Sequence, residues 1–158
     1  MNPVLAITAA IACASLLSGC MVPSPYIPIR NYDGYDDTRL QENVFSVSFA
    51  GNEVTSQQRA HDFALLRCAD VTLTNGFRYF IPADSAQTVR NEAYQTVESV
   101  PTRYGRVRTY DTSTVTSRPQ SGLTIVCYKE KPEAKNGLTY DAQYLANSIR
   151  EKYKLPAK

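Results

Sequence analysis

Hydrophobic and polar residues alternate in two short segments of the chain, residues 43–52 and 122–129. One face of the first carries Phe45, Val47 and Phe49. In the second segment, one face carries Leu123, Ile125 and Cys127. Because successive side chains of a strand point to opposite faces, both patterns predict half-buried β-strands. Residues 77–83 predict another strand, which ends near Pro82.

Two further segments have apolar residues at the 3.6-residue spacing of a helix. The first has them on more than one side, so we expect it to be covered on more than one side or to meet a partner, whereas the second is amphipathic. The first begins at Thr55, where the Thr-x-x-Gln pattern of residues 55–58 is typical of a capping box. It runs to about Asn75, and Gly76 follows as a residue that easily adopts a left-handed conformation. The second covers residues 142–153. Its apolar positions are Ala142, Leu145, Ala146, Ile149 and Tyr153.

Residues 84–120 are rich in Thr, Ser, Arg and Gln, and short alternations occur at 93–100 and 106–115. This pattern predicts a polar, mobile β-hairpin that turns at Tyr104-Gly105, outside the core. The chain is therefore expected to form one α+β domain over residues 42–158. We expect a small antiparallel or mixed sheet with two helices packed on one face.

The N-terminal stretch Pro3–Gly19 has no charged side chain and is too short to span a bilayer comfortably. It has the apolar character of a signal peptide, residues 1–19, although Met1-Asn2 lacks Lys or Arg. Leu17-Ser18-Gly19-Cys20 resembles the bacterial lipobox. That resemblance implies cleavage before Cys20, which would carry a diacylglycerol on sulfur and a fatty acyl chain such as palmitate on its new amine. The alternative is a buried N-terminal helix.

A lipidated Cys20 would begin a mature chain of 158 − 19 = 139 residues. Residues 20–41 contain three prolines and no periodicity, so we expect an extended tether between the lipid and the domain. The alternative is a loop packed on the domain through its tyrosines. Met21 stands where an Asp would retain an enterobacterial lipoprotein in the inner membrane. The resemblance therefore implies an outer-membrane anchor, with the domain facing the periplasm.

The residues that could support catalysis or metal binding are few. The only histidine, His61, stands beside Asp62, and neighbouring helical residues point in different directions. Asp33, Asp36 and Asp37 lack the spacing of a calcium loop. A net charge of +2 gives no general attraction for nucleic acid. With no nucleotide-binding or hydrolase motif present, we expect no enzyme activity, cofactor, metal or nucleic-acid partner.

The hairpin is the strongest candidate for a binding surface. Its tip interleaves cationic and aromatic residues: Arg103, Tyr104, Arg106, Arg108 and Tyr110. Arg and Tyr are common at protein interfaces, and the periplasm offers lipid phosphates, lipopolysaccharide, peptidoglycan and acidic proteins. The alternative is a solvated edge whose arginines only oppose aggregation.

Cys68 and Cys127 form a candidate disulfide. The predicted helix places Cys68 toward the sheet, and the strand pattern places Cys127 on the core face. The periplasm favours disulfide formation, whereas two separately buried thiols remain the alternative.

Residues 51–80 resemble the central block of a family of small proteobacterial lipoproteins. The matching features are a Gly-Asn turn, an LLRCA-type helix and an NGF-x-YF strand. The resemblance implies a location and a fold, but no activity. We expect a non-catalytic lipoprotein that docks to an envelope component or assembly. The alternatives are a periplasmic sensor or ligand-binding protein and, less favoured, an envelope enzyme.

Overall fold

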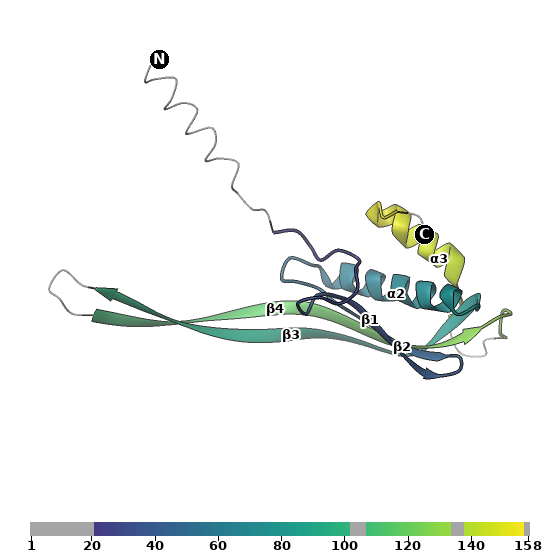
Figure 1. Ribbon diagram of the computed structural model, residues 1–158, viewed down its shortest axis with the longest axis horizontal. Coiled ribbons are helices and arrows are strands. Elements are labelled where there is room, and N and C mark those ends of the chain that lie inside the picture. The colour runs from purple at the N-terminus through teal and green to yellow at the C-terminus, as the bar shows by residue number, and fades with distance from the viewer. Residues whose placement is uncertain (1–20, 102–106, 134–137, 157–158) are drawn as a thin grey trace, which may run out of the picture.

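The computed structural model describes residues 21–101, 107–133 and 138–156, with the backbone alone over 94–101, 107–112 and at 114. Five antiparallel strands form a sheet in the order β1-β2-β4-β3-β5. The strands are β1 (Gly34–Gln41), β2 (Val44–Ala50), β3 (Tyr79–Pro101), β4 (Val107–Tyr128) and β5 (Tyr140–Asp141). The helices are α2 (Gln57–Thr74) and α3 (Ala142–Tyr153), which lie on the same side of the sheet (Figure 1). The predicted α+β class is confirmed.

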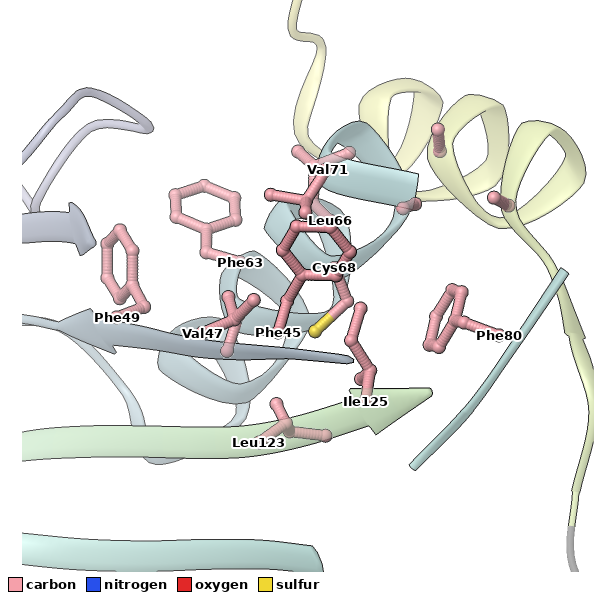
Figure 2. Close-up of a cluster of buried hydrophobic side chains, with 14 of the residues drawn as sticks. Phe45, Val47, Phe49, Phe63, Leu66, Cys68, Val71, Phe80, Leu123 and Ile125 are labelled. Atoms are coloured by element: carbon pink, nitrogen blue, oxygen red, sulfur yellow. The ribbon is translucent and has the colours of Figure 1, made fainter. Parts of the chain in front are cut away.

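The hydrophobic core lies between α2 and the inner strands (Figure 2). The two alternating segments found in the sequence are strands, and their predicted inner faces are buried. Phe63 of α2 packs edge-to-face on Phe49 of β2, with ring centroids 5.2 Å apart. Burial of this continuous apolar face holds the helix on the sheet.

Helix α2 begins one residue later than the sequence predicts. Ser56 is the N-cap, and its hydroxyl accepts a hydrogen bond from the backbone N–H of Arg59. Thr55 is buried instead, and its hydroxyl donates to Asn52 Oδ1 over 2.6 Å. Gly76 follows the C-cap with φ +77°, which confirms the left-handed position expected there.

The folded domain begins further toward the N-terminus than predicted. Residues 34–41 were expected in the tether but form the edge strand β1, which pairs with β2. Backbone pairing overrides the lack of apolar periodicity there, because an edge strand needs only one hydrogen-bonded neighbour. Residues 21–33, hereafter the N-terminal segment, pack on the domain, as the alternative proposed. Residues 1–20, including Cys20, lie outside the described residues.

The hairpin at 84–120 is confirmed, but its strands are much longer than predicted. β3 does not end at Pro82, because a register shift between Pro82 and Asp84 accommodates the proline and pairing then continues to Pro101↔Val107. Pairing of β4 with β2 ends at Ala50↔Gln120. Beyond that pair the two strands run on together past α2 (Figure 1). We call residues 89–101 and 107–119 the arm, which projects about 40 Å at 3.3 Å per residue.

The C-terminal helix is confirmed, and a short strand that the sequence did not predict precedes it. β5 pairs with the beginning of β3 at Phe80↔Tyr140 and Tyr79↔Asp141. Asp141 also caps α3 by accepting hydrogen bonds from the backbone N–H groups of Gln143 and Tyr144. The residues of α3 buried against the core are Ala142, Ala146 and Ile149.

Candidate functional site: the arm and its root

Three of the five predicted binding residues, Arg103, Tyr104 and Arg106, lie outside the described residues. The backbone of the other two belongs to β4, where Arg108 stands opposite Val100 and Tyr110 opposite Glu98. The register therefore brings both to the outer end of the described arm. Whether they bind a partner stays a prediction.

The register gives the two faces of the arm different chemical character. Residues directly opposite each other in antiparallel strands share a face. One face carries the pairs Arg90↔Arg118 and Glu92↔Thr116, and the other carries Val89↔Pro119 and Ala93↔Val115. Val89 is 54% exposed and Val115 is 64% exposed. Near the root of the arm, one face is thus charged, while the other alternates small apolar side chains with the hydrogen-bonded pair Asn91↔Ser117.

The arm also has two open edges. Among the described strands, β4 has no outer neighbour beyond Gln120, and β3 is flanked by β5 only at Tyr79 and Phe80. Open edges offer unpaired N–H and C=O groups to another strand. A two-stranded ribbon is also marginal by itself in water. Both properties make the arm suited to contact a further surface.

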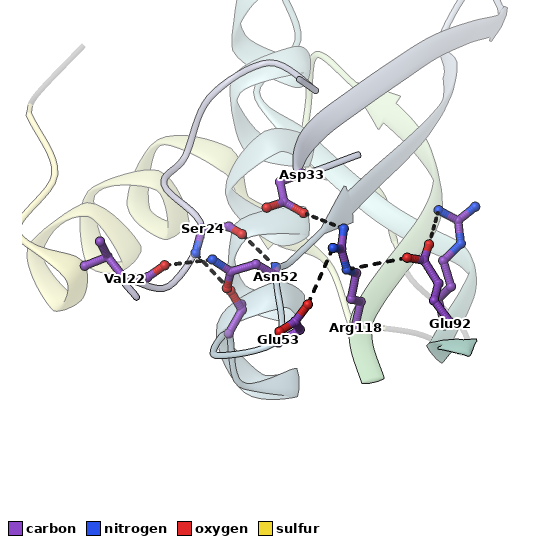
Figure 3. A network of polar contacts seen from close by, with 9 residues as sticks. Val22, Ser24, Asp33, Asn52, Glu53, Glu92 and Arg118 are labelled. Atoms are coloured by element: carbon purple, nitrogen blue, oxygen red, sulfur yellow. Dashed lines mark hydrogen bonds and ion pairs between the residues drawn. The ribbon is translucent and has the colours of Figure 1, made fainter. Parts of the chain in front are cut away.

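A network of ion pairs, all longer than hydrogen bonds, links the root of the arm to the domain (Figure 3). The guanidinium group of Arg118 approaches Glu53 at 3.6 Å, Asp33 at 3.8 Å and Glu92 at 3.9 Å. Arg90 pairs with Glu92 across 3.7 Å. The contacts join the arm to the N-terminal segment and to the β2–α2 loop. Arg118 lies in the polar segment 84–120, but no local pattern indicates its carboxylate partners, which come from three separate segments.

A small cavity of about 150 Å³ lies beside this network. The N-terminal segment contributes Ile29 and Tyr32, and the arm contributes Arg90, Arg118 and Pro119. Small-molecule pockets usually measure about 300–1,000 Å³. The cavity therefore has room for a side chain or a few waters, but not for a typical cofactor.

His61 and Asp62 point apart, as the sequence predicts. His61 Nδ1 lies 3.2 Å from the hydroxyl of Ser121 and 3.4 Å from Nε2 of Gln87. Asp62 instead contacts α3, where it accepts hydrogen bonds from Lys152 and Tyr153. No cluster of three or more metal-ligating side chains occurs in the part of the chain that the structure describes.

Cys68 and Cys127 are free, buried thiols in this structure, so the candidate disulfide is not formed. Both lie at the interface between α2 and the sheet, as predicted, and Cys127 Sγ is 3.3 Å from the hydroxyl of Thr72. Burial raises the pKa of both thiols, and the nearby Cys127 raises that of Cys68 further. Neither thiol has the exposed, electropositive surroundings of a reactive cysteine.

No family model, curated protein or solved structure matches this sequence. Within the described ranges, the helices are too short or too polar to cross a bilayer. The proposed function therefore rests on the geometry of the arm and its root.

Proposed function

We propose that the protein is a non-catalytic lipoprotein of the outer membrane whose domain docks through its arm to an envelope component or assembly. The observation that carries the proposal is the projection of the arm about 40 Å beyond the sheet with both edges open. None of the described side chains of the arm belongs to the hydrophobic core. Contact with a partner explains why the chain maintains the arm.

The anchor is proposed on the sequence of residues 17–20, which resembles a lipobox. Acylation of Cys20 would attach the chain to the periplasmic leaflet of the outer membrane by several acyl chains. Since each buried methylene contributes about 0.8 kcal/mol, two or more chains give stable attachment. The partner of the arm is then a protein, peptidoglycan or lipopolysaccharide within reach of that leaflet.

Docking is favoured over sensing or catalysis by the features of the domain. The cavity at the arm root is small, and the described part of the chain offers no metal-ligating cluster. The arm, in contrast, combines open edges with one charged face and one face of mixed small apolar and polar side chains. Open edges and a mixed polar and apolar surface suit recognition of another surface.

Shortening the arm tests the proposal. Arg90 and Arg118 lie directly opposite each other, next to the Val89↔Pro119 pair, in which Pro119 O accepts from Gly51 of the neighbouring segment. Because the backbone groups of successive strand residues point to opposite sides, those of Arg118 point toward Arg90. Arg90↔Arg118 is therefore the hydrogen-bonded pair that flanks a two-residue hairpin loop. Replacing residues 91–117 by Asn-Gly should leave the melting temperature nearly unchanged. The complex captured by the full-length protein from solubilised membranes should be lost.

A finer variant, Arg103→Gln with Arg106→Gln and Arg108→Gln, tests the predicted binding residues. The complex should weaken without loss of folding stability, because the three arginines lie in the polar hairpin that the sequence predicts outside the core. An intact complex in the shortened variant would contradict the proposal. A variant with Cys20→Ser should lose fatty-acid labelling and outer-membrane fractionation, which tests the anchor separately.

A further inference from the structure

The N-terminal segment is firmly attached to the domain at a point next to Cys20. The hydroxyl of Ser24 accepts from the backbone N–H of Asn52 over 2.7 Å, and the backbone N–H of Ser24 donates to Thr55 Oγ1 over 2.9 Å. The side-chain amide of Asn52 donates to Val22 O over 2.7 Å (Figure 3). Ordered contacts therefore begin two residues after Cys20. Little free chain would separate a lipid on Cys20 from the domain.

The same segment carries a concentration of exposed hydrophobic side chains. Of the eleven large hydrophobic residues exposed in the described chain, five fall within residues 21–32. They are Met21, Val22, Ile27, Ile29 and Tyr32, which we call the apolar patch. Val22 is 74% exposed and Tyr32 is 70% exposed. The residues that turn inward are Ser24, which is 1% exposed, and Tyr26, whose ring contacts Phe63.

Few backbone N–H groups of residues 21–30 lack a hydrogen-bond acceptor within the protein. Three of residues 21–30 are prolines, which have no N–H, and four others donate within the protein: Ser24, Ile27, Ile29 and Arg30. Seven of these ten residues therefore bring no unpaired N–H to a neighbouring surface. This matters because an unpaired backbone group costs free energy when it leaves water for an apolar environment.

The charge of the segment fits a phospholipid surface. Arg30 and Asp33 are the charged residues of the N-terminal segment; Asp33 lies 3.8 Å from Arg118, whereas the cationic Arg30 is exposed to solvent. A cation next to exposed aliphatic and tyrosine side chains is typical of a protein surface at a bilayer interface. The cation meets lipid phosphates, while the apolar side chains enter the headgroup–acyl boundary.

We propose that the apolar patch docks onto the phospholipid surface of the membrane that holds the anchor, so that the domain lies on the bilayer and does not hang from a tether. The inference rests on the proposed lipidation of Cys20, which brings the patch to the surface. The short connection makes the effective concentration of lipid at the patch high. A weak apolar contact then suffices to fix the orientation of the domain.

The absence of Trp from the sequence allows a clean fluorescence test. The full-length lipidated protein carrying Tyr32→Trp is reconstituted into vesicles of phosphatidylethanolamine and phosphatidylglycerol. The matched control is Tyr144→Trp on α3, since Tyr144 is 77% exposed and Tyr32 is 70% exposed. Quenching by aqueous iodide should fall several-fold on reconstitution for Tyr32→Trp and stay constant for Tyr144→Trp. Equal quenching of both variants in acylated protein would overturn the proposal.

A second measurement separates docking from lipidation. Vesicle partitioning of the unacylated Cys20→Ser chain is compared with that of the same chain carrying Val22→Ser, Ile29→Ser and Tyr32→Ser. The control set, Leu40→Ser, Leu138→Ser and Tyr144→Ser, removes similarly exposed side chains outside the patch and the arm. The patch variant should partition at least about tenfold less well, because it removes three apolar side chains whose transfer out of water is favourable. Equal losses of vesicle partitioning in the patch set and the control set would contradict docking. If only the patch set loses partitioning but the wild-type protein is not acylated at Cys20, the anchor alone is contradicted.

Discussion

Asp62 is a largely buried carboxylate that holds α3 against α2. It accepts hydrogen bonds from Lys152 Nζ at 2.6 Å, Tyr153 Oη at 2.7 Å and Gln58 Nε2 at 2.7 Å. Burial alone would raise the pKa of Asp62, but these donors outweigh it and hold the pKa below the ordinary value of 3.8. The contribution of Asp62 to stability is therefore present above the unfolded-state pKa. It is lost as the pH falls through the lower folded-state value.

Replacing Asp62 by Asn should lower the free energy of unfolding by about 1–3 kcal/mol at pH 7, because the charged acceptor of three donors is lost. It should also flatten the fall in stability with decreasing pH below about 4. Urea denaturation at a series of pH values measures both effects. Asp36→Asn, at an exposed position of β1, is the control and should change neither. Parallel pH curves for wild type and Asp62→Asn would contradict the account.

Cys68 and Cys127 give a second test at the residue scale. Since both thiols are free, buried and raised in pKa, an alkylating agent should not modify them in the native protein. After unfolding without reductant, both should be modified, as mass spectrometry will show. Failure of both residues to react after unfolding would reveal a disulfide in the mature protein. The free-thiol arrangement would then be wrong.

At the scale of elements, one buried ion pair connects α2, α3 and the N-terminal segment. Arg150 of α3 donates to both carboxylate oxygens of Asp70 in α2, over 2.7 and 2.9 Å. Tyr26 Oη donates to the same carboxylate over 2.9 Å. Burial and the Asp70 carboxylate together raise the pKa of Tyr26, which keeps its hydroxyl protonated as the donor. The three elements are therefore stabilised as a unit.

Removing the cation from this unit should destabilise the domain strongly. Arg150→Leu leaves Asp70 without its bidentate partner, and we expect a loss of about 3–5 kcal/mol in the free energy of unfolding. Tyr26→Phe removes one hydrogen bond but keeps the ring contacts, so about 1 kcal/mol is expected. Chemical denaturation gives both values. Similar small effects from the two variants would mean that Arg150 does not stabilise the packed helices.

The sequence predicted most reliably those elements with apolar residues at regular spacing. β2, the inner part of β4 and α3 each bury one face, α2 is covered by both the sheet and α3, and all four were found. β1 was missed because its residues are polar and it depends on pairing with β2. The full length of the arm was not predicted because Pro82 suggests the end of a strand. Only the pairing of β3 with β4 shows that a register shift accommodates this proline. The arm root combines residues distant in the chain, so no local pattern indicates it.

The whole molecule combines a compact core with an arm and an apolar patch that meet at one place. Ile29 and Tyr32 of the patch and Arg90 and Arg118 of the arm line the same cavity. If the patch rests on the bilayer, the arm leaves the domain close to the membrane surface. The proposed partner of the arm would then be found in the layer next to that surface.

Site-specific photocrosslinking in living cells tests most directly whether the arm docks. A photoreactive residue at Val115 in the arm is compared with one at Leu138 outside it, because their exposed fractions of 64% and 65% match. The account predicts that the Val115 position crosslinks to one partner of defined mass, or to a cell-wall or lipopolysaccharide species, while the Leu138 position gives none. The same crosslink pattern at both positions, or crosslinks at Leu138 alone, would contradict it.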